Sequence, residues 1–295
     1  MKRRALSAGL AAAIAIAGVS AEARMHAPYR GHRIVASGAA PLDGFTTPSA
    51  AYSFRKLRSA YAGPAIRLRR ASDNAEQDIN FLGFTGFTGA PIDTAQANAH
   101  CAATTCTVVT RYDQSGNARH ITQATAANQP AFIFNCQNGL PCLRATDSAQ
   151  ILQSAAGGLT TASPISIGSV AIRNSGTALC RSLYVFFNQL YASPGGGSWT
   201  LQADTTLSVT AADAQWHALL GVINGAATVL RADATEVTGT MAATAGVIDS
   251  IQAPIGPAAG TTCSHGEDIL WSGYGLTAPE RAALTANQKS FWGIP

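Results

Sequence analysis

The chain has 295 residues, of which 47% are hydrophobic and only 12% are charged, and its formal net charge is +4 at pH 7. This charge is small and scattered, whereas nucleic-acid-binding domains gather Lys and Arg on one face, so we expect no nucleic-acid partner. The length suits one large all-β domain, because sandwiches of this size fold without splitting.

The first 23 residues have the pattern of an export signal peptide. Lys2, Arg3 and Arg4 precede an Ala/Ile/Leu-rich stretch that runs to Val19, and small-x-small cleavage patterns follow up to Ala23. The apolar stretch is shorter than the roughly 20 residues that a spanning helix needs, which disfavours the alternative of a membrane anchor. We therefore expect export to the periplasm or the extracellular space, by the Sec or the twin-arginine route, and no membrane span in the mature protein.

Residues 24–44 are polar and aperiodic, so we expect a linker or flexible arm there, followed by a single domain over 45–295. Ala51–Tyr61 is interpreted as a short helix or turn. Ala65–Arg70 alternates apolar and basic residues, which predicts a half-buried strand with its arginines facing water.

A second strand is predicted over Thr107–Tyr112, which is β-branched and aromatic. Before it, Asp93 is expected to cap a short helix. After it, Asp113 opens a turn, and its carboxylate most simply accepts a hydrogen bond from the backbone at Ser115 or Gly116. This interpretation gives Asp113 a structural role.

The stretch Cys101–Gln123 reads CAATTCTVVTRYDQSGNARHITQ. It resembles the catalytic domain of the fungal and bacterial α-L-arabinofuranosidase B family, whose members carry a similar FCAxTTC loop followed by YDQSGNGNHLTQ. The likeness continues upstream through AYSFRKLRSAYAGPAIRLRRASDNAEQDI. It implies an all-β fold, a two-sheet jelly-roll or lectin-like sandwich. It also implies an exported carbohydrate-active protein whose partner is an arabinose-containing polysaccharide or another glycan.

Beyond residue 130, short apolar runs alternate with turn signals, which is typical of a sandwich. The predicted strands are Ala131–Asn135, Ile165–Arg173, Leu183–Asn188, Trp199–Ala203, Trp216–Ile223, Thr228–Ala232 and Ile269–Trp271. At the end of the chain, Thr277 and Glu280 form a capping-box pattern with Pro in the first turn. A short amphipathic helix is therefore expected to close the domain.

Six cysteines in an exported chain favour disulfides. Two local pairs flank turn-rich segments, which leaves the last two cysteines as partners. The predicted bridges are Cys101–Cys106, Cys136–Cys142 and Cys180–Cys263. The alternative is a zinc site that uses these cysteines with His100, His120 or His265, but no C-x2-C pair and no tight His spacing occur, so we expect no metal and no cofactor.

Glycoside hydrolysis normally needs two carboxyl groups across a cleft. The resemblance implies a glutamate nucleophile in a WxMVDMEN-like run and an aspartate acid in a GGDN loop. Here the first run reads WTLQADTT, which puts Asp204 within one residue of the nucleophile's place, and the second reads IGPAAG without the aspartate. Glu267 and Asp268 follow as candidate proton donors. The alternative is that Asp204 is a strand-end turn residue and that the other two acids are solvated. Members of the family have two adjacent cysteines that line the sugar pocket, whereas this chain has only Cys180 in that region.

Aromatic residues suggest a second function, because sugar rings stack on exposed Trp and Tyr faces. Trp199, next to three glycines, is the candidate platform, whereas Trp216 and Trp271 are expected in the core. Two functions therefore remain open. One is an arabinofuranosidase-like hydrolase of terminal arabinofuranosyl residues, and the other is a non-catalytic, lectin-like carbohydrate-binding or cell-surface module. The missing loop aspartate favours the second.

Overall fold

The computed structural model describes residues 40–83, 89–155, 159–185, 187–248 and 250–295. The predicted signal peptide and residues 24–39 of the predicted arm lie outside this part of the chain, so their assignment stays a prediction. The last residues assigned to the arm are packed, because Leu42 is fully buried and its N–H donates to the carbonyl of Leu57 at 2.9 Å. No helix within these ranges is long and apolar enough to cross a membrane.

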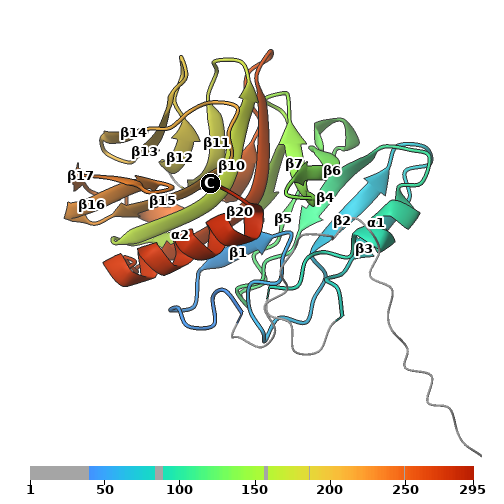
Figure 1. Ribbon diagram of the computed structural model, residues 1–295, viewed down its shortest axis with the longest axis horizontal. Helices are drawn as coiled ribbons and strands as arrows, with labels where there is room; N and C mark the ends of the chain where they lie inside the picture. Colours follow the sequence, from blue (N-terminus) through green and yellow to red (C-terminus); the bar gives the residue numbers. More distant parts are fainter. Residues whose placement is uncertain (1–39, 84–88, 156–158, 186, 249) are drawn as a thin grey trace, which may run out of the picture. The chain divides into compact units, whose positions relative to one another are not determined.

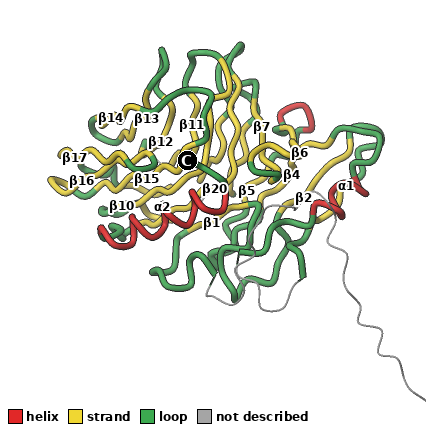
Figure 2. The backbone as a smooth tube through the Cα atoms, in the orientation of Figure 1, coloured by secondary structure: helices red, strands yellow, loops and turns green. Residues whose placement is uncertain are grey.

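Strands dominate the described chain (Figures 1 and 2). Eighteen of them join in one hydrogen-bonded network, in which the pairs are antiparallel. The network folds into two layers. The front sheet contains, in spatial order, β14 (Thr206–Thr210), β13 (Ser198–Gln202), β12 (Asn188–Ala192), β11 (Cys180–Val185), β19 (Ile251–Ile255), β8 (Ile151–Ser154) and β5 (Ile121–Thr122). The back sheet contains β17 (Thr235–Met241), β16 (Gly225–Ala232), β15 (His217–Ile223), β10 (Ile165–Ser175), β20 (Thr262–Ser272), β7 (Leu140–Ala145) and β6 (Ala131–Gln137).

The two sheets join at β4 (Cys106–Arg111), which pairs with β5 of the front sheet and β6 of the back sheet. The remaining elements are attached around this frame. They are β1 (Ala50–Ser53) beside β20, β2 (Ile66–Arg70) and β3 (Glu76–Ile79) beside β4, the separate pair β9 (Leu159–Thr161) and β18 (Gly246–Ile248), and the helices α1 (Thr94–His100), η2 (Ala126–Asn128) and α2 (Ala278–Trp292). The predicted all-β, two-sheet sandwich with a short C-terminal helix is confirmed.

The main core lies between the two sheets. Leu190 of β12 and Leu201 of β13 are fully buried there with Leu219 and Leu230 of the back sheet. A Cβ atom on Gly221 of β15 would lie 2.5 Å from Leu201 Cδ1, so only glycine lets the leucine pack directly on the opposite sheet. This contact fixes which face of the front sheet points inward.

The outer face of the back sheet is covered by α2, which lies across β15 and β10 (Figure 1). Leu284 of α2 packs with Leu220 of β15 and Ile269 of β20 in a second buried cluster. The predicted capping box is present, because the side chains of Thr277 and Glu280 each bond the other residue's backbone. With both of its faces covered, β15 is buried along its whole length.

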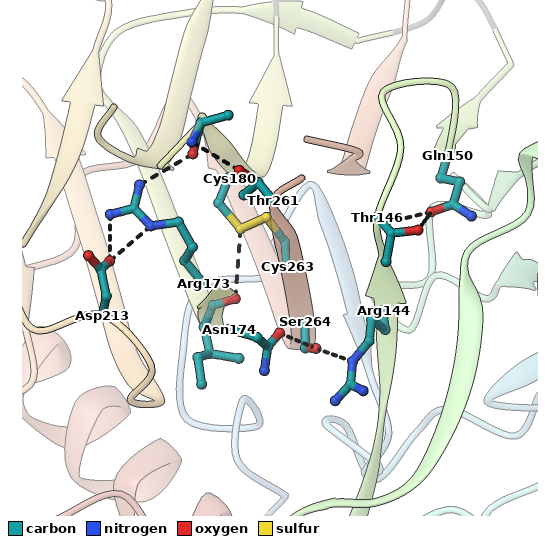
Figure 3. Close-up of a disulfide and its surroundings, with 12 residues drawn as sticks. Arg144, Thr146, Gln150, Arg173, Asn174, Cys180, Asp213, Thr261, Cys263 and Ser264 are labelled. Carbon is teal, nitrogen blue, oxygen red and sulfur yellow. Dashed lines mark hydrogen bonds and ion pairs between the residues drawn. A yellow bond between two sulfur atoms is a disulfide. The ribbon is translucent and has the colours of Figure 1, made fainter. Parts of the chain in front are cut away.

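Three disulfides are formed, with the predicted pairing. Cys180–Cys263 joins β11 of the front sheet to β20 of the back sheet (Figure 3). Beside it, Arg173 of β10 bonds the Asp213 carboxylate with Nε at 2.9 Å and the Ser193 carbonyl with a terminal nitrogen at 2.5 Å. The bridge and the arginine therefore tie the two layers together at one end of the sandwich.

The interpretation of Ala51–Tyr61 as a short helix or turn is wrong for its first residues, because Ala50–Ser53 is strand β1, paired with Leu270–Glu267 of β20. A turn is present only at Ser59 and Ala60. The sequence of β1, AAYS, has little intrinsic strand preference, and the pairing with β20 decides its conformation. The Asp93 cap is confirmed, since its side chain accepts from the N–H of Gln96 at 3.0 Å.

Candidate functional site

The Asp113 turn, the most recognisable motif of the sequence, is a structural junction. Asp113 Oδ1 accepts from the N–H groups of Ala51 and Ser115, both at 2.9 Å, and Oδ2 accepts from the hydroxyl of Ser115 at 2.7 Å. Oδ2 also accepts from the N–H of Arg119 at 3.0 Å. Asp113 is buried and holds β1 to the turn after β4, so its predicted structural role is confirmed.

Glu267 lies on the helix side of the back sheet and forms a buried ion pair with Arg55. Its carboxylate accepts from Arg55 Nε at 2.7 Å, from Ser53 Oγ at 2.9 Å and from Gln288 Nε2 of α2 at 3.1 Å. Burial alone would raise the pKa of Glu267, but the charge and hydrogen bonds of Arg55, with the bonds from Gln288 and Ser53, outweigh it and lower the pKa. This carboxylate is ionised and enclosed.

Asp268 points to the opposite face of β20, because successive side chains of a strand alternate. It forms an ion pair with Arg111 at 2.5 Å and accepts from Ser169 Oγ at 2.7 Å. Burial raises its pKa to about 6, against the opposing effects of Arg111 and Ser169. Both acids of β20 are 0% exposed, so the alternative that they are solvated is wrong.

Asp204 is exposed in the turn between β13 and β14, where its Oδ1 accepts from the N–H of Ala242 at 3.0 Å. Ala242 directly follows β17, and four strand-to-strand steps separate β17 from β20, or about 19 Å along the sheet. Paired carboxyl groups of glycosidases lie within ~10 Å of each other. The structure therefore does not bring Asp204 together with Glu267 or Asp268.

The prediction that Trp199 forms a sugar-binding platform is wrong. This residue is 1% exposed and belongs to the main core, because Trp199 and Leu201 share the inward face of β13. The three glycines beside it, Gly195–Gly197, all have positive φ and form a tight turn whose Gly197 N–H donates to Asp213 at 2.9 Å. The glycines therefore serve the backbone turn. Trp216 and Trp271 are buried, as predicted.

The outward face of the front sheet carries a line of polar side chains that crosses six strands. We call it the cross-strand polar row; its members, in order from β13 through β12, β11, β19 and β8 to β5, are Gln202, Gln189, Tyr184, Gln252, Gln153 and Thr122. Each residue is the register partner of the next, and directly opposed residues of antiparallel strands share one face. The row therefore follows one continuous line across the sheet.

The neighbours of the row along each strand confirm its outward direction. Leu190, Leu201, Ile251, Leu152 and Ile121 each adjoin a row residue in sequence and are buried in the main core. Except for Gln189, which is 9% exposed, the row residues are partly or fully accessible. Alternation of polar and apolar residues signals such a face in each strand, but the sequence does not show which strands lie side by side.

The row is held in place by hydrogen bonds between its own side chains. Gln189 Nε2 donates to Gln202 Oε1 at 2.6 Å, and Gln189 Oε1 accepts from Arg181 Nε at 2.8 Å. Gln252 Nε2 lies 3.5 Å from Gln153 Oε1. Because an amide has two donor hydrogens and an oxygen with two lone pairs, these bonds leave capacity for a ligand.

Within the ranges that the structure describes, no three or more His, Cys, Asp or Glu side chains gather as a metal site. The cysteines named in the zinc alternative are all engaged in disulfides. His265 is fully buried, and burial followed by the charge of Arg111 lowers its pKa to about 3.

Sequence comparison finds relatives of the first part of the domain. A family model described as "Alpha-L-arabinofuranosidase B, catalytic" matches residues 39–145. A probable α-L-arabinofuranosidase B of Aspergillus terreus is 40% identical over 94 residues, which cover 31% of this chain and 18% of the relative. An α-L-arabinofuranosidase of Hypocrea jecorina is 41% identical over 106 residues, which cover 31% of this chain and 20% of the relative. The matched part thus spans about a fifth of these relatives.

Solved structures share the fold over a longer stretch. A GH54 arabinofuranosidase soaked with a cyclic sulfate inhibitor has a TM-score of 0.63 at 18% identity, covering 82% of this chain and 62% of that one. An arabinofuranosidase complexed with arabinofuranosyl-α-1,2-xylobiose has a TM-score of 0.64 at 17% identity, covering 83% and 63%. These structures show the shared fold, and the predicted resemblance to the α-L-arabinofuranosidase B catalytic domain is confirmed over residues 39–145.

Proposed function

We propose that this chain, related through residues 39–145 to the α-L-arabinofuranosidase B catalytic domain, is an exported protein that binds carbohydrate without hydrolysing it. The observation that carries the proposal is the state of the acids on β20. Glu267 and Asp268 are enclosed in ion pairs with Arg55 and Arg111, and neither faces Asp204. A glycosidase needs both carboxyl groups at the sugar, so this arrangement favours binding over cleavage.

Two further observations support the proposal. Three disulfides are consistent with an oxidising compartment outside the cytoplasm. The outward face of the front sheet offers neutral amides and a tyrosine, the side chains that suit hydroxyl-rich ligands. Arabinose-containing polysaccharides are the first ligands to test, because one solved relative was crystallised with an arabinofuranosyl sugar.

Hydrolysis of terminal arabinofuranosyl residues is the second candidate function. It is favoured by Asp204, which is exposed and lies in the turn that follows β13, within one residue of the predicted nucleophile position. Acting as nucleophile, Asp204 would need a proton donor other than the enclosed acids of β20, or a rearrangement that frees Glu267 or Asp268 from its arginine.

The test is a pair of assays on the purified mature protein. Hydrolysis is measured with aryl α-L-arabinofuranosides and other aryl glycosides, and binding is measured by affinity electrophoresis in arabinan and arabinoxylan. We expect retarded migration without turnover. Turnover that disappears in Asp204→Asn but persists in the exposed control Asp147→Asn would establish the hydrolase instead, and neither binding nor turnover would overturn both functions.

A further inference from the structure

We propose that the cross-strand polar row is the binding site of an extended, neutral polysaccharide whose chain runs perpendicular to the strands. This inference rests on the proposed carbohydrate-binding function and adds the place, the direction and the charge class of the ligand. It depends on the register of the front sheet and on none of the three predicted catalytic acids.

The row is long enough to bind several units of a polysaccharide and is longer than a single sugar ring. Neighbouring strands lie about 4.8 Å apart, so five steps from Gln202 to Thr122 extend about 24 Å. One sugar ring is comparable in size to one strand step. A chain lying along the row therefore meets a new polar side chain at about every unit, whereas a single sugar would engage only one or two of them.

The chemistry of the row fits hydroxyl groups. Four of its six members are glutamines, and each amide can donate to one hydroxyl while it accepts from the next. Neither the Nε2 of Gln202 nor that of Gln153 has a protein partner among the described residues. These donors are available to a ligand, and the bonds from Arg181 to Gln189 and from Gln189 to Gln202 already fix the amide planes.

The charge of the row excludes an acidic polysaccharide as the preferred ligand. None of its six members is charged, and the adjacent cation, Arg181, is engaged by Gln189. Recognition of carboxylate or sulfate groups uses Arg or Lys at bidentate or clustered positions, which this line lacks.

Two aromatic rings, those of Tyr184 and Phe187, lie close together near the middle of the cross-strand polar row. Phe187, in the turn between β11 and β12, is 60% exposed, more than any other large hydrophobic residue that the structure describes, and its φ is +63°. A positive φ is uncommon for a bulky side chain, and here it belongs to the tight turn that joins β11 to β12. The Phe187 ring centroid lies 6.3 Å from that of Tyr184 at an interplanar angle of 71°. The two rings offer a stacking surface that the buried Trp199 cannot provide.

The experiment measures affinity against ligand length and charge by titration calorimetry. The probes are neutral arabino- and xylo-oligosaccharides of two to six units, with oligogalacturonates as the acidic comparison. We expect the dissociation constant to fall with each added neutral unit up to about five or six, the number set by the strand steps, and no measurable binding of the acidic series.

Variants locate the site. Tyr184→Ala should weaken binding of the longest neutral probe about tenfold by removing a stacking ring, and Gln252→Ala about two- to tenfold by removing a neutral hydrogen bond. Gln153→Ala is a third row variant, and because Gln153 is exposed, this substitution should leave folding unchanged. Gln77→Ala, an exposed glutamine on β3, is the matched control and should bind like the wild type.

The outcomes separate the two proposals. If the wild type binds no glycan, the proposed function fails and the site fails with it. If the wild type binds but its affinity is independent of length, or survives in all folded row variants, the polysaccharide site on the row is overturned while carbohydrate binding stands.

Discussion

Two neighbouring acids of β20 have opposite pKa shifts, although both are completely buried and each faces an arginine. The pKa of Glu267 is lowered because, against burial, it has Arg55, Gln288 and Ser53 around it. The pKa of Asp268 is raised to about 6, because burial outweighs Arg111 and Ser169. Glu267 therefore contributes stability above its unfolded pKa that is lost as pH falls, whereas the contribution of Asp268 is present below pH 3.8 and is lost as pH rises through about 6.

Removing one partner of the buried Arg111–Asp268 ion pair should lower the stability of the folded protein. Arg111→Met leaves Asp268 without its counter-ion inside the core, so we expect a loss of about 3–5 kcal/mol in the free energy of unfolding. The control is Arg67→Met, which breaks a pair with Asp78 whose side chains are 41% and 37% exposed, and which should cost only about 0–1 kcal/mol. Urea unfolding of both variants measures the difference, and equal losses would contradict this account of the core.

His217 and His120 should show opposite pH dependence. Burial lowers the pKa of His217, but the bonds to Asp233 and to the Ala212 carbonyl raise it more, for a net increase. Burial lowers the pKa of His120, whose Nδ1 accepts from the Asp113 N–H at 3.0 Å. The stability from His217 is thus present below pH 6.5 and is lost as pH rises through its folded pKa, whereas that from His120 is present above pH 6.5 and is lost as pH falls.

Urea midpoints of wild type, His217→Gln and His120→Gln at pH 5 and pH 8 test this expectation. The destabilisation by His217→Gln should be larger at pH 5, and that by His120→Gln larger at pH 8. The same trend in both variants would show that one of the two histidines has the opposite shift.

At the scale of elements, β20 connects most of the sandwich. It pairs with β10 along its length, with β1 at one end and with β7 at the other. It also carries Cys263, which reaches β11 in the front sheet. A change in β20 therefore acts on both layers at once.

The three disulfides should contribute unequally. Cys180 and Cys263 are separated by 83 positions, whereas Cys101 and Cys106 are separated by 5. By the chain-entropy estimate, the long loop is worth roughly 4–5 kcal/mol and the short one clearly less. Denaturant midpoints of Cys180→Ala/Cys263→Ala and Cys101→Ala/Cys106→Ala compare them, and similar losses would rule out loop length as the main factor.

For the whole molecule, export makes a prediction that mass spectrometry can check. We expect the mature chain to begin at Glu22 or Arg24 and to contain no free thiol, because the structure pairs all six cysteines. The intact mass after alkylation should be unchanged without reduction and should rise by six adducts after reduction. Two or more adducts before reduction would remove the three-bridge model, and an intact residue 1 would remove the signal peptide.

Features that depend on neighbouring residues could be predicted from the sequence. The alternation in Ile66–Arg70, the Asp93 cap, the Asp113 turn and the capping box at Thr277 are local, because each is made by side chains and backbone a few positions apart. The disulfide pairing followed from spacing, and the fold class followed from the motif resemblance and the cadence of strands. Fold and bridges were therefore predictable.

The contacts made across the sheets could not be predicted, because they join parts of the chain that are far apart in sequence. Strand pairing made AAYS a strand, turned Trp199 into the core, enclosed Glu267 and Asp268 against arginines more than 150 positions away, and aligned six polar residues in one row. Register and layer order depend on contacts between residues far apart in sequence, and a shift of one residue would move every side chain of a strand to the other face. For that reason the sequence predicts which strands are half polar, while the sheet alone decides which of their polar residues meet.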